Sequence, residues 1–268
     1  MPRRRLTVLA ATLGLSALAL TACSGGATSG ASSDAGSEYG LVSGGTLTVA
    51  TEGTYRPFSY HEGAGELTGF DVEIAKAVAD KLGLQVKFQE TQWDAIFAGL
   101  DAGRFDVVAN QVSINPERQE KYTFSTPYTV SRGVVVTTEG DDSISSFADL
   151  SGKTTAQSLT SNWYELATSS GAQVEAVEGW AQAVALLKQG RVDATINDQL
   201  TYLDYEKTNS PTGLKIAAET EDTSESAFAF KKGQDALADA VDSALEELRA
   251  DGTLTQISEK YFGSDVTQ

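Results

Sequence analysis

The chain has 268 residues, of which 41% are hydrophobic and 21% charged, with 37 acidic against 20 basic side chains. Its net charge of −17 would repel nucleic-acid phosphates, so DNA and RNA are not expected partners. The length allows one large domain or two of roughly 110 residues.

The first 22 residues have the pattern of a removable export signal. Three arginines at positions 3–5 precede an apolar stretch from Leu6 to Leu20 that polar and small residues interrupt. The stretch is shorter than the roughly 20 apolar residues of a spanning helix, and small residues typical of a cleavage site follow it. We therefore expect residues 1–22 to be removed; the loss of three arginines changes the net charge from −17 to −20.

Cys23 is the only cysteine, and it directly follows Leu-Thr-Ala. This sequence resembles the lipobox of bacterial lipoproteins, in which the cysteine is lipidated and becomes the mature N-terminus. The alternative is a chance cysteine near a cleavage site. Residues 24–40 are rich in Gly, Ser and Ala, which is typical of a flexible tether. We expect an exported protein that a lipid on Cys23 holds at a membrane surface, with a tether over residues 23–42.

From residue 46 the sequence alternates predicted strands and helices. Strands are predicted over 46–50, 84–88 and 105–109, and helices over 70–83 and 93–103. The first helix has apolar residues at intervals of four and a glycine as its stop signal. Strand, helix and strand in this order imply right-handed βαβ units on a parallel sheet.

After residue 133 the alternation begins again. Further strands are predicted over 153–157, 173–177, 192–196 and 226–232, and helices over 162–170, 180–189, 199–207 and 235–249. The last of these helices has an apolar stripe of Leu237, Val241, Leu245 and Leu248. We interpret the strands around 131–136 and 225–230 as two crossings between lobes, so that the first lobe is discontinuous.

One segment recurs at a constant offset of 87 residues. The segments 93–110 (WDAIFAGLDAGRFDVVAN) and 180–197 (WAQAVALLKQGRVDATIN) share Trp, Ala, Leu, Gly, Arg, Asp and Asn. In each, a helix that ends at Gly leads to a strand that ends in Asn. The alternative to two similarly built α/β lobes is chance similarity. Because ligands of open α/β sheets bind outside the carboxyl ends of the strands, Asn110 and Asn197 are predicted to face one cleft.

Four segments, taken in order, resemble the extracellular amino-acid-binding proteins of ABC importers, solute-binding protein family 3. They are GTLTVATEGTYRPFSY, LTGFDVEIAKAVADKLG, WDAIFAGLDAGRFDVVANQVSINPERQEKYTFSTPY and ADGTLTQISEKYFG. The resemblance covers about residues 44–264. It implies an α/β fold like that of type II periplasmic binding proteins: two Rossmann-like lobes joined by a two-strand hinge, with the ligand in the inter-lobe cleft. The stretches NQVSINPERQEKYTFSTPY, AQSLTSNW and ATINDQLTYLDY are most similar to cystine or cysteine binders.

The resemblance also implies boundaries, partners and a mechanism. Lobe 1 is expected to comprise residues 43–131 and 226–268, and lobe 2 residues 132–225. The lobes would close around a free amino acid, and the closed form would dock on two transmembrane permease subunits served by a cytoplasmic ATPase. No cofactor or metal is expected, and the chain is expected to act as a monomer.

A site for a free amino acid needs a cation for the carboxylate, an anion for the ammonium group and apolar walls. The resemblance places Arg118 at the carboxylate, which its paired N–H donors fit better than a lysine does. Ser113 and Thr160 are expected as further donors, and Asp198 as the acceptor for the ammonium group. The alternatives are a solvated Arg118 at a helix start and Asp198 as a helix N-cap, which is compatible with ligand binding.

Tyr55 and Trp93 are the expected aromatic walls, with core packing as the alternative for Trp93. Glu52, at the end of the first strand, is either a second acceptor for the ammonium group or a surface acid. The other residues that the resemblance places at the site are Asn110, Gln111 and Ser158.

An enzyme is the main rival class, because a few relatives on this scaffold are dehydratases. The sequence has one histidine, His61 in the Gly-rich stretch HEGAGEL, and lacks a phosphate loop, a zinc-spaced His/Cys set and a G-x-S-x-G elbow. We therefore expect a binding protein and not an enzyme. Cystine is the favoured ligand, cysteine is next, and another polar amino acid such as glutamine or glutamate is the alternative.

Overall fold

The computed structural model describes residues 39–268. The predicted export signal, Cys23 and most of the predicted tether lie outside the described residues. Within residues 39–268, none of the helices has the length and apolar character needed to cross a membrane.

The first sheet has the strand order β5-β1-β6-β14-β7, and β8 also pairs with β14. Its strands are β1 (Thr46–Thr51), β5 (Gln85–Glu90), β6 (Val107–Ser113), β7 (Tyr122–Phe124), β8 (Thr129–Ser131) and β14 (Ser224–Lys231). β1 is parallel to β5 and β6, whereas β14 is antiparallel to β6, β7 and β8. The predicted parallel sheet is therefore a mixed sheet. We call it, with its helices, lobe 1.

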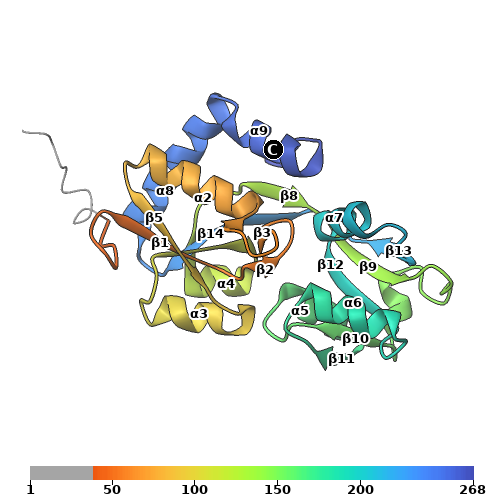
Figure 1. The fold of residues 1–268 in the computed structure, drawn as a ribbon. Helices are drawn as coiled ribbons and strands as arrows, with labels where there is room; N and C mark the ends of the chain where they lie inside the picture. The colour runs from red at the N-terminus through yellow and green to blue at the C-terminus, as the bar shows by residue number, and fades with distance from the viewer. Residues whose placement is uncertain (1–38) are drawn as a thin grey trace, which may run out of the picture. The chain divides into compact units, whose positions relative to one another are not determined.

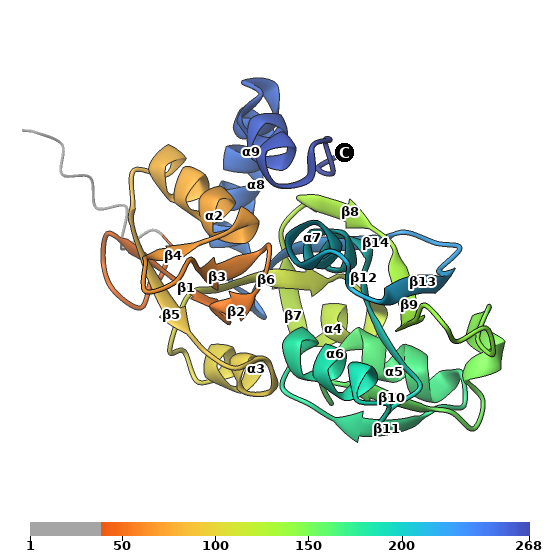
Figure 2. The ribbon, with the colours of Figure 1, turned by 45° about the vertical axis from the view of Figure 1, so that its right-hand side comes forward.

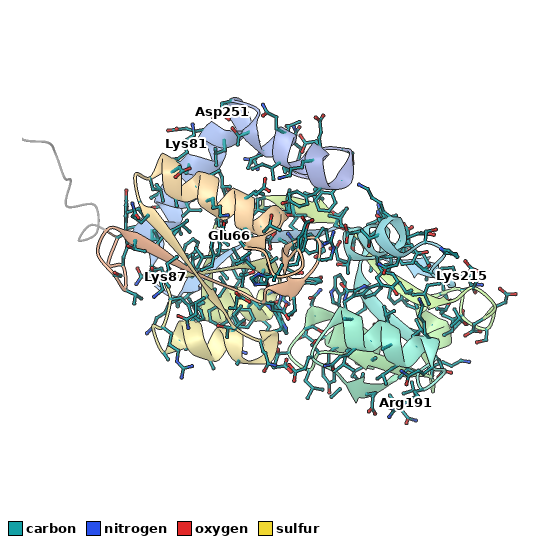
Figure 3. All side chains as sticks on the ribbon, viewed as in Figure 1. Glu66, Lys81, Lys87, Arg191, Lys215 and Asp251 are labelled. Carbon is teal, nitrogen blue, oxygen red and sulfur yellow. The ribbon has the colours of Figure 1, made fainter. Side chains whose placement is uncertain are left out.

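Helices cover both faces of the lobe 1 sheet (Figure 1). They are α2 (Phe70–Lys81), α3 (Trp93–Asp101), α4 (Pro116–Lys121), α8 (Asp235–Ala250) and α9 (Thr253–Phe262). Because neighbouring strand residues point to opposite faces, Val49 of β1 packs with α2 and α8, while Ala50 packs with α3. The predicted stripe of α8 is fully buried in this core. At the surface, Lys81 of α2 lies 2.9 Å from Asp251, which follows α8 (Figure 3).

The second sheet has the order β11-β10-β12-β9-β13 and forms lobe 2. Its strands are β9 (Gly133–Thr138), β10 (Thr154–Gln157), β11 (Gln173–Ala176), β12 (Ala194–Asp198) and β13 (Leu214–Glu219). Its helices are α5 (Asn162–Ser169), α6 (Trp180–Lys188), α7 (Gln199–Asn209) and the 3-10 turn η1 (Phe147–Leu150). In β9, Val134 and Val136 pack with α6 and α7, whereas Val135 packs with α5 and η1.

The chain passes between the two sheets twice, and the two passages lie side by side (Figure 2). It leaves β8 at Ser131 and enters β9 at Gly133, and it returns between Glu219 of β13 and Ser224 of β14. Thr220 N donates to Gly133 O at 2.8 Å, and Gly133 N donates to Thr220 Oγ1 at 3.1 Å. These bonds tie the two passages together, as the two-strand connection of the predicted fold class requires.

One strand prediction was wrong in a way that concerns the site. The strand predicted over 105–109 does not end at Asn110 but continues as β6 to Ser113, and all seven of its residues are buried. Polar side chains are tolerated there because Asn110 and Gln111 have buried hydrogen-bond partners in β1 and α2. The Gly-rich stretch HEGAGEL, expected at a hairpin tip, does connect two antiparallel strands, β3 (Ser59–His61) and β4 (Leu67–Thr68). The pairing of β2 (Thr54–Tyr55) with β3, which makes a small three-stranded sheet, was not predicted.

Candidate functional site

A cavity of about 380 Å³ is lined by residues from both lobes. Its size lies within the roughly 300–1,000 Å³ that small-molecule sites span. Six of the ten residues predicted for the site line it: Glu52, Tyr55, Trp93, Asn110, Gln111 and Ser158. The other four, Ser113, Arg118, Thr160 and Asp198, lie outside its lining.

Asn110 organises the lobe 1 wall of the cavity. Its Nδ2 donates to Glu52 Oε2 at 2.7 Å, and its Oδ1 accepts from Thr51 Oγ1 and from Glu52 N, both at 2.9 Å. Burial raises the pKa of Glu52 to about 7, against the lowering effect of the Asn110 hydrogen bond. The Glu52 carboxyl group is therefore held in place at the end of β1, which agrees better with an acceptor than with a surface acid.

Gln111 has a left-handed backbone with φ of 50°, which is uncommon for a residue other than glycine. Its N donates to Asp71 Oδ2 at 2.8 Å and its Nε2 to Asp71 Oδ1 at 2.6 Å. Asp71 is fully buried in α2, and burial raises its pKa to about 7. These two hydrogen bonds hold Gln111 in its strained conformation. Asp71 was not among the predicted site residues, although an acid on the buried face of a predicted helix is a usable signal.

Tyr55 lines the cavity and also reaches across the cleft to lobe 2. Its hydroxyl donates to Asn197 Oδ1 at 3.0 Å and accepts from Thr201 Oγ1 at 3.2 Å, and both partners belong to lobe 2. Burial raises the pKa of Tyr55 well above its ordinary value. The ring packs against Phe58 at a centroid distance of 5.0 Å. Both ends of the side chain are therefore fixed.

Arg118 is buried, with 8% of its surface exposed, so the alternative of a solvated arginine is wrong. Its Nη1 donates to Ser113 O at 3.0 Å and its Nη2 to Thr160 O at 3.3 Å, which links the two lobes. The guanidinium group lies 5.4 Å from the ring of Trp93 and 5.5 Å from that of Phe97, a cation–π arrangement. Burial lowers the pKa of Arg118 to about 10, so it remains charged at neutral pH.

Thr160 directs both of its donors at a carboxylate of the opposite lobe. Its N and Oγ1 lie 3.2 and 2.6 Å from Asp94 Oδ1, at the start of α3. These donors were expected to face a ligand carboxylate, and Asp94 was not among the predicted site residues. In the structure the Asp94 carboxylate accepts the two hydrogen bonds from Thr160 that were expected to go to the ligand carboxylate.

Asp198 is confirmed as the N-cap of α7. Its Oδ1 accepts from Leu200 N at 2.8 Å and from Ser131 Oγ at 2.7 Å. Only 4% of its surface is exposed, and burial raises its pKa to about 6. Because Ser131 belongs to β8, this carboxyl group joins lobe 2 to the first passage between the lobes.

The lobe 2 wall contains residues that the sequence analysis did not single out. They include Gln157, Trp163, Glu178, Trp180 and Gln182. Trp180 had a usable signal, because it is the counterpart of Trp93 in the repeat at an offset of 87 residues. The others stand in stretches whose residue types also fit an ordinary surface loop, so no pattern distinguishes them as site residues.

Comparisons with known proteins agree on one family. The family model for bacterial extracellular solute-binding proteins, family 3, matches residues 47–264. A "Probable amino-acid ABC transporter-binding protein" of Haemophilus influenzae is 56% identical over 223 residues, which are 83% of this chain and 87% of that protein. The L-cystine-binding protein TcyA of Bacillus subtilis is 54% identical over 225 residues, 84% of each chain.

Solved structures add a comparison of shape. An ancestral arginine-binding protein bound to arginine has a TM-score of 0.77 at 38% identity, covering 82% of this chain and 99% of that one. The L-cystine solute receptor of Neisseria gonorrhoeae, in the unliganded open conformation, has a TM-score of 0.58 at 50% identity, covering 83% and 95%. The more similar sequence thus has the lower structural score.

Proposed function

Because the chain belongs to the bacterial extracellular solute-binding proteins of family 3, we propose that it captures a free amino acid between its lobes and delivers it to the permease of an ABC importer. The observation that carries this proposal is the cavity, which both lobes line with fixed polar side chains. The two relatives above 50% identity are named as binding proteins, which favours binding over a dehydratase-type reaction.

The ligand we favour is cystine, then cysteine, with another polar amino acid such as glutamine or glutamate as the alternative. Support comes from TcyA, named for L-cystine, and from the gonococcal L-cystine receptor. The cavity adds aromatic surface from Tyr55 and Trp93, which suits a sulfur-containing chain.

For the head group, we propose that Arg118 binds the carboxylate and that Asp198 and Glu52 accept from the ammonium group. Arg118 now donates to two backbone carbonyl oxygens, and Thr160 to Asp94. A ligand carboxylate would replace these acceptors with a stronger, charged one, since hydrogen bonds between charged groups are shorter and stronger.

We propose that the lobes comprise residues 43–131 with 226–268 and residues 132–225, and that they close by rotation about the paired passages near Gly133 and Thr220. Support comes from the TM-scores, because a rotation between two lobes of unchanged internal fold lowers the score against an open structure despite higher sequence identity. The closed form would dock on the transmembrane subunits as a monomer, without a cofactor.

We also propose a lipid on Cys23, which lies outside the described residues. The support is Leu-Thr-Ala-Cys after an apolar stretch. Expressed in a bacterium, the protein should partition with membranes, and Cys23→Ser should abolish this partitioning. Recovery of the wild type as fully soluble material with a free Cys23 thiol would contradict the proposal.

A thermal-shift panel of the twenty amino acids plus cystine tests the proposed function. A ligand at 100 times its dissociation constant adds about 2.7 kcal/mol to the free energy of unfolding. We expect the largest shift with cystine. A large shift with glutamine or arginine and none with cystine would refute the cystine assignment, and no shift with any amino acid would refute the function.

A further inference from the structure

The part of the cavity in lobe 2 has no assigned role, although lobe 2 supplies most of the lining. There the cavity meets the N-terminus of α6 at Gly179, Trp180 and Gln182 and the end of β10 at Gln157. We call these four residues, with Glu178, the α6 end of the cavity. None of them belongs to the head-group site proposed around Arg118.

The α6 end offers hydrogen-bond donors without acceptors. The first N–H groups of a helix have no partner within it, and among residues 39–268 no side chain caps α6, because its N-cap is Gly179. Gln157 is only 4% exposed, and its Nε2 has no hydrogen-bond partner in the described chain. The same holds for Trp180 Nε1. Backbone and side-chain donors at one place, together with the helix dipole, favour a carboxylate.

An acid stands directly beside these donors. Glu178 precedes the α6 N-cap, and its backbone is held by Gln182 Oε1, which accepts from Glu178 N at 3.0 Å, and by Ser158 Oγ, which donates to Glu178 O at 3.0 Å. Glu178 lines the cavity, and its carboxylate forms no hydrogen bond with residues 39–268. A carboxylate acceptor next to unpaired donors is complementary to an α-amino-carboxylate group, which carries both charges.

We propose that the α6 end is a second head-group subsite, so that the ligand is a single molecule with two α-amino-carboxylate groups. This inference rests on the proposed function and deepens it. One head group binds at Arg118, and the second places its carboxylate at the α6 N-terminus and Gln157 and its ammonium group at Glu178. The linker between the head groups packs on Trp93 and Trp163, which line the same cavity. Disulfide-linked and thioether-linked bis-amino acids share this chemistry, whereas an amino acid with one head group leaves the subsite empty.

Two variants test the subsite. Gly179→Ser supplies a hydroxyl that caps α6, so it should compete with the ligand carboxylate; the added Cβ meets open space. Gln157→Leu removes the unpaired donor at similar size. In calorimetric titrations, each should weaken binding of L-cystine about tenfold or more and change the binding of S-methyl-L-cysteine, which has one head group, by less than about twofold. Gly179→Ser should leave the melting temperature unchanged or raised, which a merely structural loss would not do.

The matched control is Gln189→Leu at the exposed C-cap of α6, which should leave both affinities unchanged. A thioether-linked bis-amino acid shows whether the subsite recognises the second head group or the disulfide. If it binds about as tightly as cystine, the head group is what the subsite recognises. Gly179→Ser should then weaken its binding as much as it weakens that of cystine. Equal weakening of cystine and S-methyl-L-cysteine, or no weakening of either, overturns the inference while the proposed function stands. If the wild type binds no amino acid at all, the proposed function itself fails.

Discussion

The repeated unit occurs as residues 93–110 in lobe 1 and as residues 180–197 in lobe 2. Both copies have the same backbone hydrogen bond in the turn that connects the helix to the strand. Arg104 N donates to Gly99 O, and Arg191 N donates to Leu186 O, both at 3.0 Å. Gly103 and Gly190 have φ values of 65° and 66°, which the tight turn requires. The residues that the two copies share at this turn therefore adopt the same backbone conformation.

The shared aspartates also have one role. Asp106 Oδ2 accepts from Thr48 N at 2.7 Å, and Asp193 Oδ2 accepts from Thr154 N at 2.8 Å. Each aspartate N donates back to the carbonyl oxygen of the same threonine, at 2.9 and 2.8 Å. In both lobes the aspartate therefore joins the start of its strand to the neighbouring strand.

The copies differ at their last residue. Asn110 bonds within lobe 1, to Thr51 and Glu52, whereas Asn197 accepts from Tyr55 of the opposite lobe. The two copies therefore agree in the turn between helix and strand, where the same backbone groups need hydrogen-bond partners in each lobe. They differ at the strand ends, which face the cleft. There Asn110 holds the wall of its own lobe, whereas Asn197 contacts the opposite lobe.

The largest effect is expected at Arg118 of α4, the proposed carboxylate site in lobe 1, which lies just beyond the lobe 1 copy. Removing one partner of a buried, hydrogen-bonded charge pair costs about 2–5 kcal/mol, so Arg118→Ala should weaken amino-acid binding roughly 30- to 4000-fold. Arg118→Lys should also lose affinity because a point charge cannot supply paired N–H donors. Titration calorimetry measures both, on protein that melts like the unliganded wild type.

The matched control is Arg104→Ala, which removes the exposed arginine of the junction in the same lobe. It should keep the affinity of the wild type. Near-normal affinity in a folded Arg118→Ala variant would falsify the assigned carboxylate site.

The shared aspartate role can be sharpened with a pair of variants. Asp106 is buried and accepts from two backbone N–H groups, of Val42 and Thr48. Its loss in Asp106→Ala should lower the free energy of unfolding by about 1–3 kcal/mol. Asp193 is exposed and accepts from Thr154 N alone among the described residues, so Asp193→Ala should cost about 0.5–1.5 kcal/mol. Urea unfolding of both variants provides the test; a larger loss for Asp193→Ala would contradict it.

Each copy has a carboxyl group near its final asparagine, Glu52 in lobe 1 and Asp198 in lobe 2. Burial raises their pKa values to about 7 and about 6. Only the ionised forms attract an ammonium group, so ligand affinity should fall as pH falls from 8 to 5, by at most about tenfold per pH unit for each group. Calorimetry across this range measures the ligand affinity at each pH. The inflection of affinity near pH 7, which belongs to Glu52, should be absent in Glu52→Gln. A flat profile would argue against both acceptors.

The stability of the unliganded protein should change with pH in the opposite direction. Both groups have folded-state pKa values above their ordinary values of 4.5 and 3.8. Their contribution to stability is therefore fully present below the ordinary values and is lost as pH rises through about 6 and 7. Melting curves with and without ligand separate the two trends. Parallel trends would mean that these carboxyl groups are not the ones the ligand contacts.

The smallest expected effect concerns one of the hydrogen bonds between the lobes, that of the Tyr55 hydroxyl to Asn197. Asn197→Ala and Tyr55→Phe each remove the hydrogen bond of the Tyr55 hydroxyl to Asn197 and should each weaken ligand binding by about 0.5–1.5 kcal/mol. The double variant should lose less than the sum, because both changes delete the same Tyr55–Asn197 hydrogen bond, although Tyr55→Phe also removes the acceptor of Thr201 Oγ1 and Asn197→Ala that of Asp198 N. Fully additive losses would show that the two residues act separately.

The helices and the repeat could be predicted because their signals are local. The stripe of α8 and the glycine stops at Gly103 and Gly190 follow from spacing alone. The extension of β6 could not be predicted, because Asn110 and Gln111 look like a loop until Glu52 and Asp71, about 60 and 40 residues earlier, satisfy their amide groups. A single sequence does not show such distant partners.

The site was predicted unevenly for the same reason. In the lobe 1 wall, Glu52 and Asn110 stand at the ends of predicted strands and Tyr55 was expected from the family resemblance; all three line the cavity. The lobe 2 wall depends on where the loop before α6 turns, which no spacing indicates for Gln157 or Glu178. The strand β13 was missed because it carries polar residues among its apolar ones.

The three tryptophans described above are the only ones in the chain, and all three, Trp93, Trp163 and Trp180, line the same cavity. All of the indole emission of the protein therefore comes from side chains that line this cavity. A disulfide accepts electrons from an excited indole ring, so cystine should dim this emission, whereas a thioether-linked analogue bound at the same place should not. Tryptophan emission would thus distinguish a bound disulfide from a bound thioether without any added label.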